Sequence, residues 1–533
     1  MYRKVAGQGD RMSKPSRRPG RDAIKLQRKE HKKAERKLHA ACKAQGIEMP
    51  PSATIANRIC QCKTVEEETA MRLDAVSAQI KAYRSGLPVL LRRLEKIPDT
   101  RNPKTRKHKL TVLVVYGILC FTFQMSSRRA ATREMTRPMF MENLRLLFPE
   151  LETLPHHDTL ARLLEQIDVS ELEKAHVEMI RHLIGNKKFC RYLLRGAYPI
   201  AIDGTQKFKR GELWDLECLE RKARTGKSED AAIGGAPEDE KRQYYVYVLE
   251  ANLTFHNGMV IPLMSEILGY TQGDNDKDKQ DCEQRAFHRL AKRLKEYFPH
   301  LSIMILLDGL YANGPVMALC RQYKWDYMIV LKDDVLPSVW EEVRSLLALQ
   351  QSNRYRQRWG NRQQRFEWVS DIDYRYRCPL TGKEKKIPVH VVICSENWEE
   401  IAPGSTEVVA KNSRHVWISA QPVDARTVHE RCNLGARHRW GIEGSILVEK
   451  HQGYCYEHCF SYDWKAMTGY HYLMRIGHTL NVLARYSHAL TKHVLELGTS
   501  GLIEFVRNTI AAPWIAADKL RQIAAGHCQL RLE

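Results

Sequence analysis

Residues 198–204 (YPIAIDG) begin the part of the chain that decides the fold. They contain a short apolar run that ends at an aspartate. A second segment of this kind, residues 302–308 (SIMILLD), also ends at an acidic residue. Short apolar runs bounded by turn residues are typical of buried strands. The two patterns therefore predict strands that deliver Asp203 and Asp308 to the end of a sheet.

The sequence around these two strands predicts an alternation of strands and helices. Residues 244–255 alternate between apolar and polar, and the turn residues 256–258 (HNG) link them to a strand at 259–268 as a hairpin. A helix is predicted at 279–298, a second helix at 314–322 and a further strand at 327–332. This order is that of a ribonuclease-H-like α/β layer, in which the first and fourth strands are parallel neighbours. Asp203 and Asp308 would then lie side by side.

A third carboxylate, Glu443, stands in the segment RHRWGIEGSILVEK at residues 437–450. Clustered carboxylates supply the hard oxygen ligands with which a pair of Mg²⁺ ions, about 3.5–4 Å apart, clamps both sides of a phosphodiester. Taken alone, Asp203 and Asp308 are each better explained as turn residues, because Asp-Gly is a common turn. The strand order and the later Glu443 segment together favour the acidic site.

The segment that carries Glu443 resembles a known family. Residues 439–450 are similar to the Arg-x3-Glu-x6-Lys signature of bacterial insertion-sequence transposases of the DDE class, those with a β-rich insertion between the second Asp and the Glu. Residues 453–460 and 463–486 resemble that family's C-terminal part, so the resemblance covers roughly residues 198–490. The chain departs from the signature at Ala436, where the family has a tyrosine that helps to hold the DNA end.

The resemblance implies roles for the residues of the third motif and for the two aspartates. Asp203, Asp308 and Glu443 would be the catalytic residues and would ligate two Mg²⁺ ions per active site, with Mn²⁺ as a substitute. Arg439 and Lys450 would bind phosphates close to the cut. On a helix, residues 439, 443 and 450 share one face. The plainer alternatives are a surface ion pair between Arg439 and Glu443 and an ordinary solvated lysine at 450.

The region from 350 to 430 is predicted to be rich in strands. Gly360-Asn361 is a two-residue hairpin signal between two arginine-rich and aromatic-rich runs. Alternation places most arginines on one face and most aromatics on the other. We expect the arginines and one tryptophan to contact DNA, whereas core packing is the alternative for the aromatic residues. The predicted DNA-binding residues of this hairpin are Arg354, Arg356, Arg358, Trp359, Arg362 and Arg365.

The net charge of the 533-residue chain is +22, which suits a polyanionic partner. Residues 1–40 hold 14 Lys and Arg against 4 Asp and Glu. We expect a disordered stretch at 11–21 and a basic helix at 24–45 that orders on DNA phosphates, with a merely solvated helix as the alternative. Helical patterns dominate as far as residue 195, and the segment 66–97 contains an expected break near residues 85–88.

The predicted fold class is therefore a multidomain α+β protein. A helical basic N-terminal region precedes a ribonuclease-H-like catalytic domain, which a β-rich insertion interrupts and which ends in a helical C-terminus. The expected boundaries are 1–45 for the basic arm, 46–195 for a helical DNA-binding or assembly region, 196–349 for the first part of the core, 350–430 for the insertion, 431–490 for the helical part of the core and 491–533 for the tail.

No segment is expected to cross a membrane. The most apolar run, residues 110–123, is shorter than the roughly 20 residues that a bilayer requires. The basic start of the chain has no apolar segment behind it, so no signal peptide is expected. The 14 scattered cysteines indicate reduced thiols. We therefore expect a cytoplasmic, nucleoid-associated protein.

From the resemblance we expect a DDE transposase that binds double-stranded DNA at terminal inverted repeats, nicks the ends and joins them to target DNA. Two active sites must act on two ends, so a homodimer is expected in the synaptic complex. Two other functions stay open. One is a ribonuclease-H-like nuclease that cuts without joining, and the other is a non-catalytic DNA-binding descendant.

Overall fold

The computed structural model describes residues 20–48, 59–222, 242–273, 280–349, 352–379, 381–526 and 529–533. It divides the chain into two compact units. Unit 1 comprises residues 1–53, 351–367 and 393–415, and unit 2 comprises residues 54–350, 368–392 and 416–533. The structure is of mixed α+β class. The disorder expected at 11–21 falls almost wholly outside the described residues.

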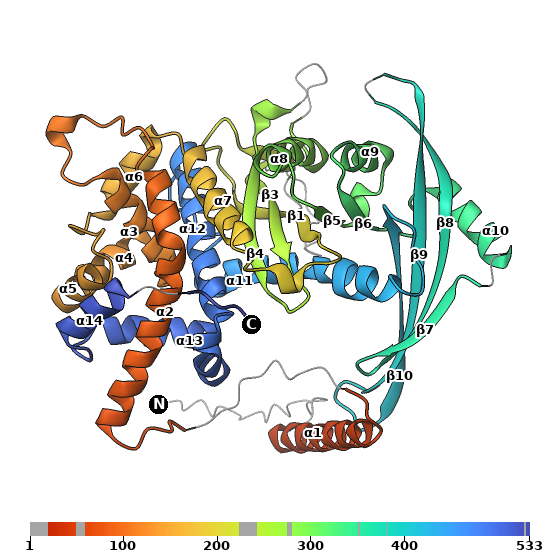
Figure 1. Ribbon diagram of the computed structural model, residues 1–533, viewed down its shortest axis with the longest axis horizontal. Helices are drawn as coiled ribbons and strands as arrows, with labels where there is room; N and C mark the ends of the chain where they lie inside the picture. The colour runs from red at the N-terminus through yellow and green to blue at the C-terminus, as the bar shows by residue number, and fades with distance from the viewer. Residues whose placement is uncertain are drawn as a thin grey trace, which may run out of the picture. The chain divides into compact units, whose positions relative to one another are not determined.

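Helices from both ends of the chain pack together in unit 2. The first group is α2 (Val65–Leu94), α3 (Leu110–Thr122), α4 (Arg128–Met135), α5 (Pro138–Leu147), α6 (His157–Gln166) and α7 (Ser170–Gly185). The second group is α12 (Trp464–Arg485), α13 (Thr491–Ile510) and α14 (Ala517–Ala525). In Figure 1, α12 runs between α3 and α6 on one side and the strand β4 (Val260–Leu268) on the other, which agrees with its contacts to all three. Nearly every residue of α12 is buried, so this helix forms the centre of the unit.

Two helical predictions differ from the structure. The break expected near residues 85–88 is absent, because α2 continues through Pro88. Gly86 lies against α7, where a side chain would place its Cβ 2.8 Å from the sulfur of Met179, and Leu87 and Leu90 are buried. Tertiary packing thus outweighs the local cost of a proline in this helix. The sequence also predicts one continuous helical stretch at 159–186, which the structure divides into α6 and α7.

A mixed sheet forms the other part of unit 2. Its strands are β1 (Tyr198–Arg210), β2 (Leu219–Lys222), β3 (Arg242–Thr254), β4, β5 (Ile303–Leu307) and β6 (Asp326–Val330), followed by the unit 2 parts of β8 (Arg362–Arg377), β9 (Glu384–Ile401) and β10 (Val408–Ser419). The strand order is β2-β3-β1-β5-β6-β10-β9-β8, and β4 pairs with β3. The expected parallel pairing of the first and fourth strands is present between β1 and β5.

The strand that carries Asp203 is longer than predicted. We expected it to end at the aspartate, but β1 continues to Arg210 because β3 pairs with it over its whole length from Ile200. The parallel pairing with β5 stops earlier, at Ala201 opposite Leu306. Asp203 therefore lies where β1 leaves β5 while it is still held by β3.

The sheet has a helical layer on each face. Asp203 lies directly opposite Glu250 of β3, so both side chains point to the same face. Glu250 contacts Arg475 of α12, and α11 (Trp440–His451) packs on β1 and β3 at this face. On the other face, Glu266 of β4 pairs with Arg289 of α8 (Glu283–Tyr297).

Unit 1 combines a basic helix with a strand hairpin. α1 (Arg21–Ala44) has no buried residue, and its Gln27 and His31 bond to the carbonyls of Gly404 and Ser405 in the turn between β9 and β10. The predicted hairpin is present as β7 (Arg354–Trp359) paired with the first part of β8 through Gly360-Asn361. Gly360 has a φ of 55°, a value that favours glycine in a tight turn.

Candidate active site

Asp203 and Asp308 come together as the parallel register of β1 and β5 requires. The pairs run from Tyr198 opposite Ile303 to Ala201 opposite Leu306, so the same register extended by two residues sets Asp203 opposite Asp308. The Asp203 carboxylate accepts a hydrogen bond of 3.0 Å from the Gly204 N–H. Asp308 caps a short 3₁₀ turn, Gly309–Tyr311, by accepting from the Leu310 N–H at 3.0 Å. Asp308 is thus both a turn residue and a member of the pair.

Arg439 brings the third carboxylate to this pair. It stands at the start of α11, and its guanidinium donates to Glu443 at 2.8 Å and lies 3.8 Å from the Asp203 carboxylate. The Arg439 side chain is only 6% exposed, whereas that of Glu443 is 36% exposed. This is a buried bridge between two carboxylates and not a surface ion pair. In the described part of the chain, the Arg439 Nε–H has no hydrogen-bond partner.

The protonation of Asp203 depends on its burial and on the charged groups around it. Burial raises the pKa of Asp203 to about 6. The positive charge of Arg439 opposes this rise, while the carboxylates of Glu443, Asp308 and Glu283 reinforce it. Asp203 therefore lies within electrostatic reach of three other carboxylates, one of which, Glu283, the sequence analysis did not select.

The donor set of this cluster suits a hard divalent cation, because it consists of carboxylate oxygens. Asp203, Asp308 and Glu443 do not converge to within 4.8 Å of one another, since Arg439 lies between two of them. In the described residues such a close group occurs elsewhere, at His156, His157 and Asp158. In this arrangement Arg439 occupies the space in which a cation shared by Asp203 and Glu443 would bind.

Lys450 lies at the other end of α11 with an acidic partner. Its amino group is 3.0 Å from a carboxylate oxygen of Glu457 and 5.9 Å from the ring centre of Tyr456. The Lys450 side chain is only 15% exposed. Lys450 is therefore not the freely solvated lysine that the sequence left open as the alternative to a phosphate-binding residue.

A buried charge network anchors α11 below the acidic cluster. Glu449 accepts hydrogen bonds from Arg475 at 3.0 and 3.2 Å and lies 2.6 Å from His478, both on α12. Arg475 also pairs with Glu250, the β3 residue opposite Asp203, at 3.2 Å. Burial would raise the pKa of Glu250, but Arg475 and His471 outweigh it and hold that pKa well below its usual range. The network ties together the strand beside Asp203 and the helix of Glu443.

Sequence reasoning missed two residues beside the aspartates. Glu283 is the first residue of α8 and accepts hydrogen bonds from two tyrosine hydroxyls. An acidic residue in a first helical turn is expected from the helix dipole alone, so the sequence offered no reason to single it out. Lys332 follows β6 and lies against Gly309, where a Cβ would be 2.9 Å from its Cε. The end of a third parallel strand is the signal that could have identified it.

The predicted DNA-binding arginines of unit 1 fall into two groups. Three have carboxylate partners: Arg354 and Arg365 with Glu367, and Arg362 with Glu396. Arg356 and Arg358 are exposed, and the described residues offer them no acidic partner. Trp359 is half-buried. Of the other aromatic residues weighed from sequence, Phe366 is buried in unit 1 and Trp368 is buried in unit 2.

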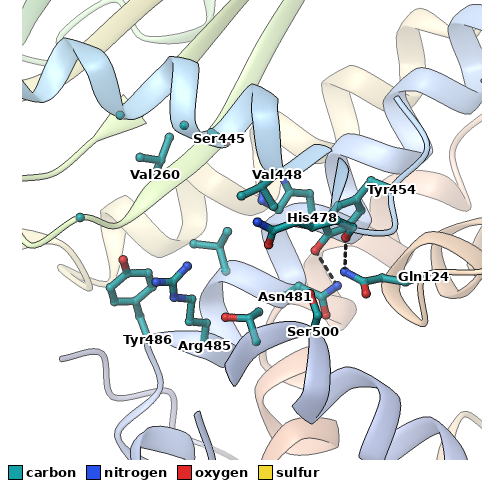
Figure 2. Close-up of a pocket in the computed structure, with 16 residues that line it drawn as sticks. Gln124, Val260, Ser445, Val448, Tyr454, His478, Asn481, Arg485, Tyr486 and Ser500 are labelled. Carbon is teal, nitrogen blue, oxygen red and sulfur yellow. Dashed lines mark hydrogen bonds between the residues drawn. The ribbon is translucent and has the colours of Figure 1, made fainter. Parts of the chain in front are cut away.

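A pocket of about 230 Å³ lies on the far side of α11 from Glu443. Figure 2 shows Ser445 and Val448 of α11 facing His478 and Asn481 of α12 across it. The lining includes neither of the two aspartates nor Glu443. The cavity is therefore separate from the acidic cluster and leaves one face of α11 loosely packed.

Comparison with known proteins gives one family relationship. Residues 91–180 match the model of the family described as DDE_Tnp_1-associated. This match indicates a relationship to DDE-type transposases, and it falls on the helical segment from the end of α2 to α7. The matched segment precedes residues 198–490, on which the resemblance was recognised from sequence. No curated protein matches the chain.

In the described part of the chain, no helix combines the length and apolarity that a membrane crossing requires. The apolar run at 110–123 forms α3, whose residues are mostly buried inside unit 2. The described cysteines form no disulfide with one another.

Proposed function

We propose that the chain is a DDE transposase of an insertion sequence, with a ribonuclease-H-like catalytic core in unit 2. The proposal rests on the register of β1 and β5, which, extended by two residues, sets Asp203 opposite Asp308. Arg439 then links Asp203 to Glu443 from a separate part of the chain. The family match at residues 91–180 supports the same class from an independent segment.

Asp203, Asp308 and Glu443 would hold two Mg²⁺ ions, with Mn²⁺ as a substitute. A bound pair of such ions supplies activation of the attacking water or 3′-hydroxyl and stabilisation of the leaving oxygen. Arg439 is the residue that changes partner when cations enter. Its fork of donors, with Nε already unpaired, suits bidentate contact with the scissile phosphate. Lys450 would contact a neighbouring phosphate after release from Glu457.

The DNA substrate would be double-stranded DNA that carries terminal inverted repeats, followed by target DNA. Unit 1 offers the basic surface for it, since α1 has nine exposed Lys and Arg against three Asp and Glu. Arg356 lies directly opposite Arg365 on the hairpin. Like charges that face each other across strands are destabilising, and Glu367 already neutralises Arg365, so a DNA phosphate would balance the charge of Arg356. Two DNA ends require two active sites, so the synaptic complex would contain a homodimer.

The test uses labelled DNA that carries the inverted repeats flanking the gene, with Mg²⁺. We expect D203A, D308A and E443A each to abolish cleavage while binding to the same DNA is largely kept, because the carboxylates serve chemistry and repel phosphate. E296Q, an exposed glutamate of α8, is the matched control and should cut like the parent protein. Near-normal Mg²⁺-dependent cleavage by any of the three alanine variants would remove that residue from the site.

The two rival functions separate in the same assay. A ribonuclease-H-like nuclease would cut end DNA but yield no joined products when target DNA is supplied. A non-catalytic DNA-binding descendant would bind end DNA and leave it intact with either Mg²⁺ or Mn²⁺. The proposal requires both cleavage and joined products.

A further inference from the structure

Glu283 is held by two tyrosines that come from the elements carrying the aspartates. Its Oε2 accepts a hydrogen bond of 3.0 Å from the Tyr247 hydroxyl, and its Oε1 accepts one of 2.7 Å from the Tyr311 hydroxyl. Tyr311 is fully buried and ends the 3₁₀ turn that begins after Asp308. Tyr247 lies on β3, which pairs with the Asp203 strand. One carboxylate thus links the Asp308 turn, the Asp203 sheet and the start of α8.

The clamp formed by Tyr247, Glu283 and Tyr311 closes over Gly204. A Cβ at Gly204 would lie 2.5 Å from the Tyr247 hydroxyl and 2.7 Å from Glu283 Oε2. Only a residue without a side chain allows this approach next to Asp203. The glycine after the aspartate therefore serves the clamp, in addition to any role in a turn.

Glu283 approaches the site from the face opposite to the Asp203 side chain. Successive residues of a strand point to opposite faces, so the Gly204 position faces α8, whereas Asp203 faces α11. Tyr247 is three residues from Glu250 on the same strand, so the two side chains point to opposite faces of the sheet. Glu250 faces α12, and Tyr247 therefore faces α8. This placement suits a group that holds the two aspartate-bearing segments together better than a group that shares one cation with Asp203.

We propose that Glu283 is a positioning residue, which through Tyr247 and Tyr311 holds Asp203 and Asp308 at the separation that divalent cations require. The proposal rests on the function proposed above. The pKa of each tyrosine is raised, first by burial and then by the charge of Glu283, so both hydroxyls remain donors at neutral pH. Removing either the acceptor or the two donors should release the Asp308 turn from the sheet.

The experiment measures Mn²⁺ binding to the full chain by calorimetry, together with thermal unfolding without metal. We expect E283A and the double variant Y247F/Y311F to weaken Mn²⁺ binding by about 10- to 100-fold, the range typical of groups that orient metal ligands. E283Q should be much milder, because its amide oxygen still accepts from one hydroxyl and its amide nitrogen can donate to the other. Y245F, two residues away on the same face of β3, is the matched control and should bind like the parent.

The outcomes distinguish the two proposals. If E283Q is as poor as E283A while Y247F/Y311F binds normally, Glu283 is a direct cation ligand and the positioning role is overturned. Parent-like binding by both E283A and Y247F/Y311F overturns it as well. If D203A and the parent bind Mn²⁺ equally, the acidic cluster is not a metal site, and the proposed function fails together with this inference. If E283A unfolds unit 2, its melting temperature will be lowered. In that case Mn²⁺ binding by the single variant Y311F is compared with that of the parent.

Discussion

At the scale of single residues, Arg439 and Asp203 show how the acidic cluster balances its charge. Arg439 is the cation that lies between Asp203 and Glu443, yet the pKa of Asp203 is still raised to about 6, first by burial and then by the three surrounding carboxylates. Folding thus places an ionised Asp203 where its charge is poorly compensated. Residues that serve a function often carry a cost in stability of this kind.

The consequence for stability follows from the direction of that shift. The folded protein holds the Asp203 proton more tightly than the unfolded chain does, so this group stabilises the fold below about pH 4 and loses that contribution as the pH rises to about 6. We expect D203N to be more stable than the parent at pH 7, by about 1 to 3 kcal/mol for a shift near two units. Urea unfolding between pH 4 and pH 8 measures this difference. D334N, at an exposed aspartate, should show no such gain, and equal stability of D203N and the parent at pH 7 would contradict the raised pKa.

At the scale of elements, α11 is held firmly on one face and loosely on another. Its Glu449 belongs to the buried network with Arg475 and His478, whereas Gly441 and Gly444 line the pocket of Figure 2. Breaking one member of a buried ion pair typically costs about 3–5 kcal/mol, so the network fixes the position of the helix. The glycine face contributes little to that position.

The open face of α11 leads to a prediction about the helix itself. A Cβ at Gly444 would meet nothing within 4 Å, whereas one at Gly441 would lie 3.0 Å from Val260. We expect G444A to stabilise the protein by about 0.5–1 kcal/mol, since alanine restricts the unfolded chain and favours the helix. G441A is the matched comparison on the same helix and should gain less or lose stability. Thermal unfolding compares the two, and a loss of stability in G444A would mean that the space beside it is not open.

The elements differ in how far the sequence alone predicts them. The sequence predicts the hairpin at Gly360-Asn361 from a local pattern and the β1–β5 pairing from the order of strands and helices, but it does not predict β2. The continuation of α2 through Pro88 depends on packing against Met179, which no local pattern contains. Glu283 was missed for the same reason, because its significance comes from tyrosines that lie far from it along the chain.

At the scale of the whole molecule, the basic helix α1 and the acidic cluster belong to different units. The nine exposed basic residues of α1 belong to unit 1, while the acidic residues of the candidate site belong to unit 2. Under the proposed function, this division would separate affinity for DNA, which basic residues supply, from the chemistry on DNA. Affinity and cleavage should therefore respond to different sets of substitutions.

Salt dependence measures the contribution of α1. Replacing Lys29, Lys32, Lys33 and Lys37 with glutamine should lower DNA affinity and make it less dependent on salt, by about one unit of logarithmic slope for each lysine that contacts a phosphate. Replacing the same four lysines with arginine keeps the charge and should leave the slope unchanged. Binding isotherms across a series of salt concentrations provide the slopes. Identical slopes for the glutamine variant and the parent would show that α1 does not touch DNA.

The central place of α12 has a consequence for how the protein is made. Asn481 donates a hydrogen bond of 3.0 Å to the carbonyl of Thr122 in α3, and the two residues are 359 positions apart in the chain. At a synthesis rate of about 5–20 residues per second, roughly 20–70 seconds pass between the translation of one partner and that of the other. During that interval the apolar residues of α3 lack the helix that covers them in the finished protein. A nascent chain that stops before α12 would therefore be a substrate for chaperones and proteases, so that the cell accumulates few partial copies.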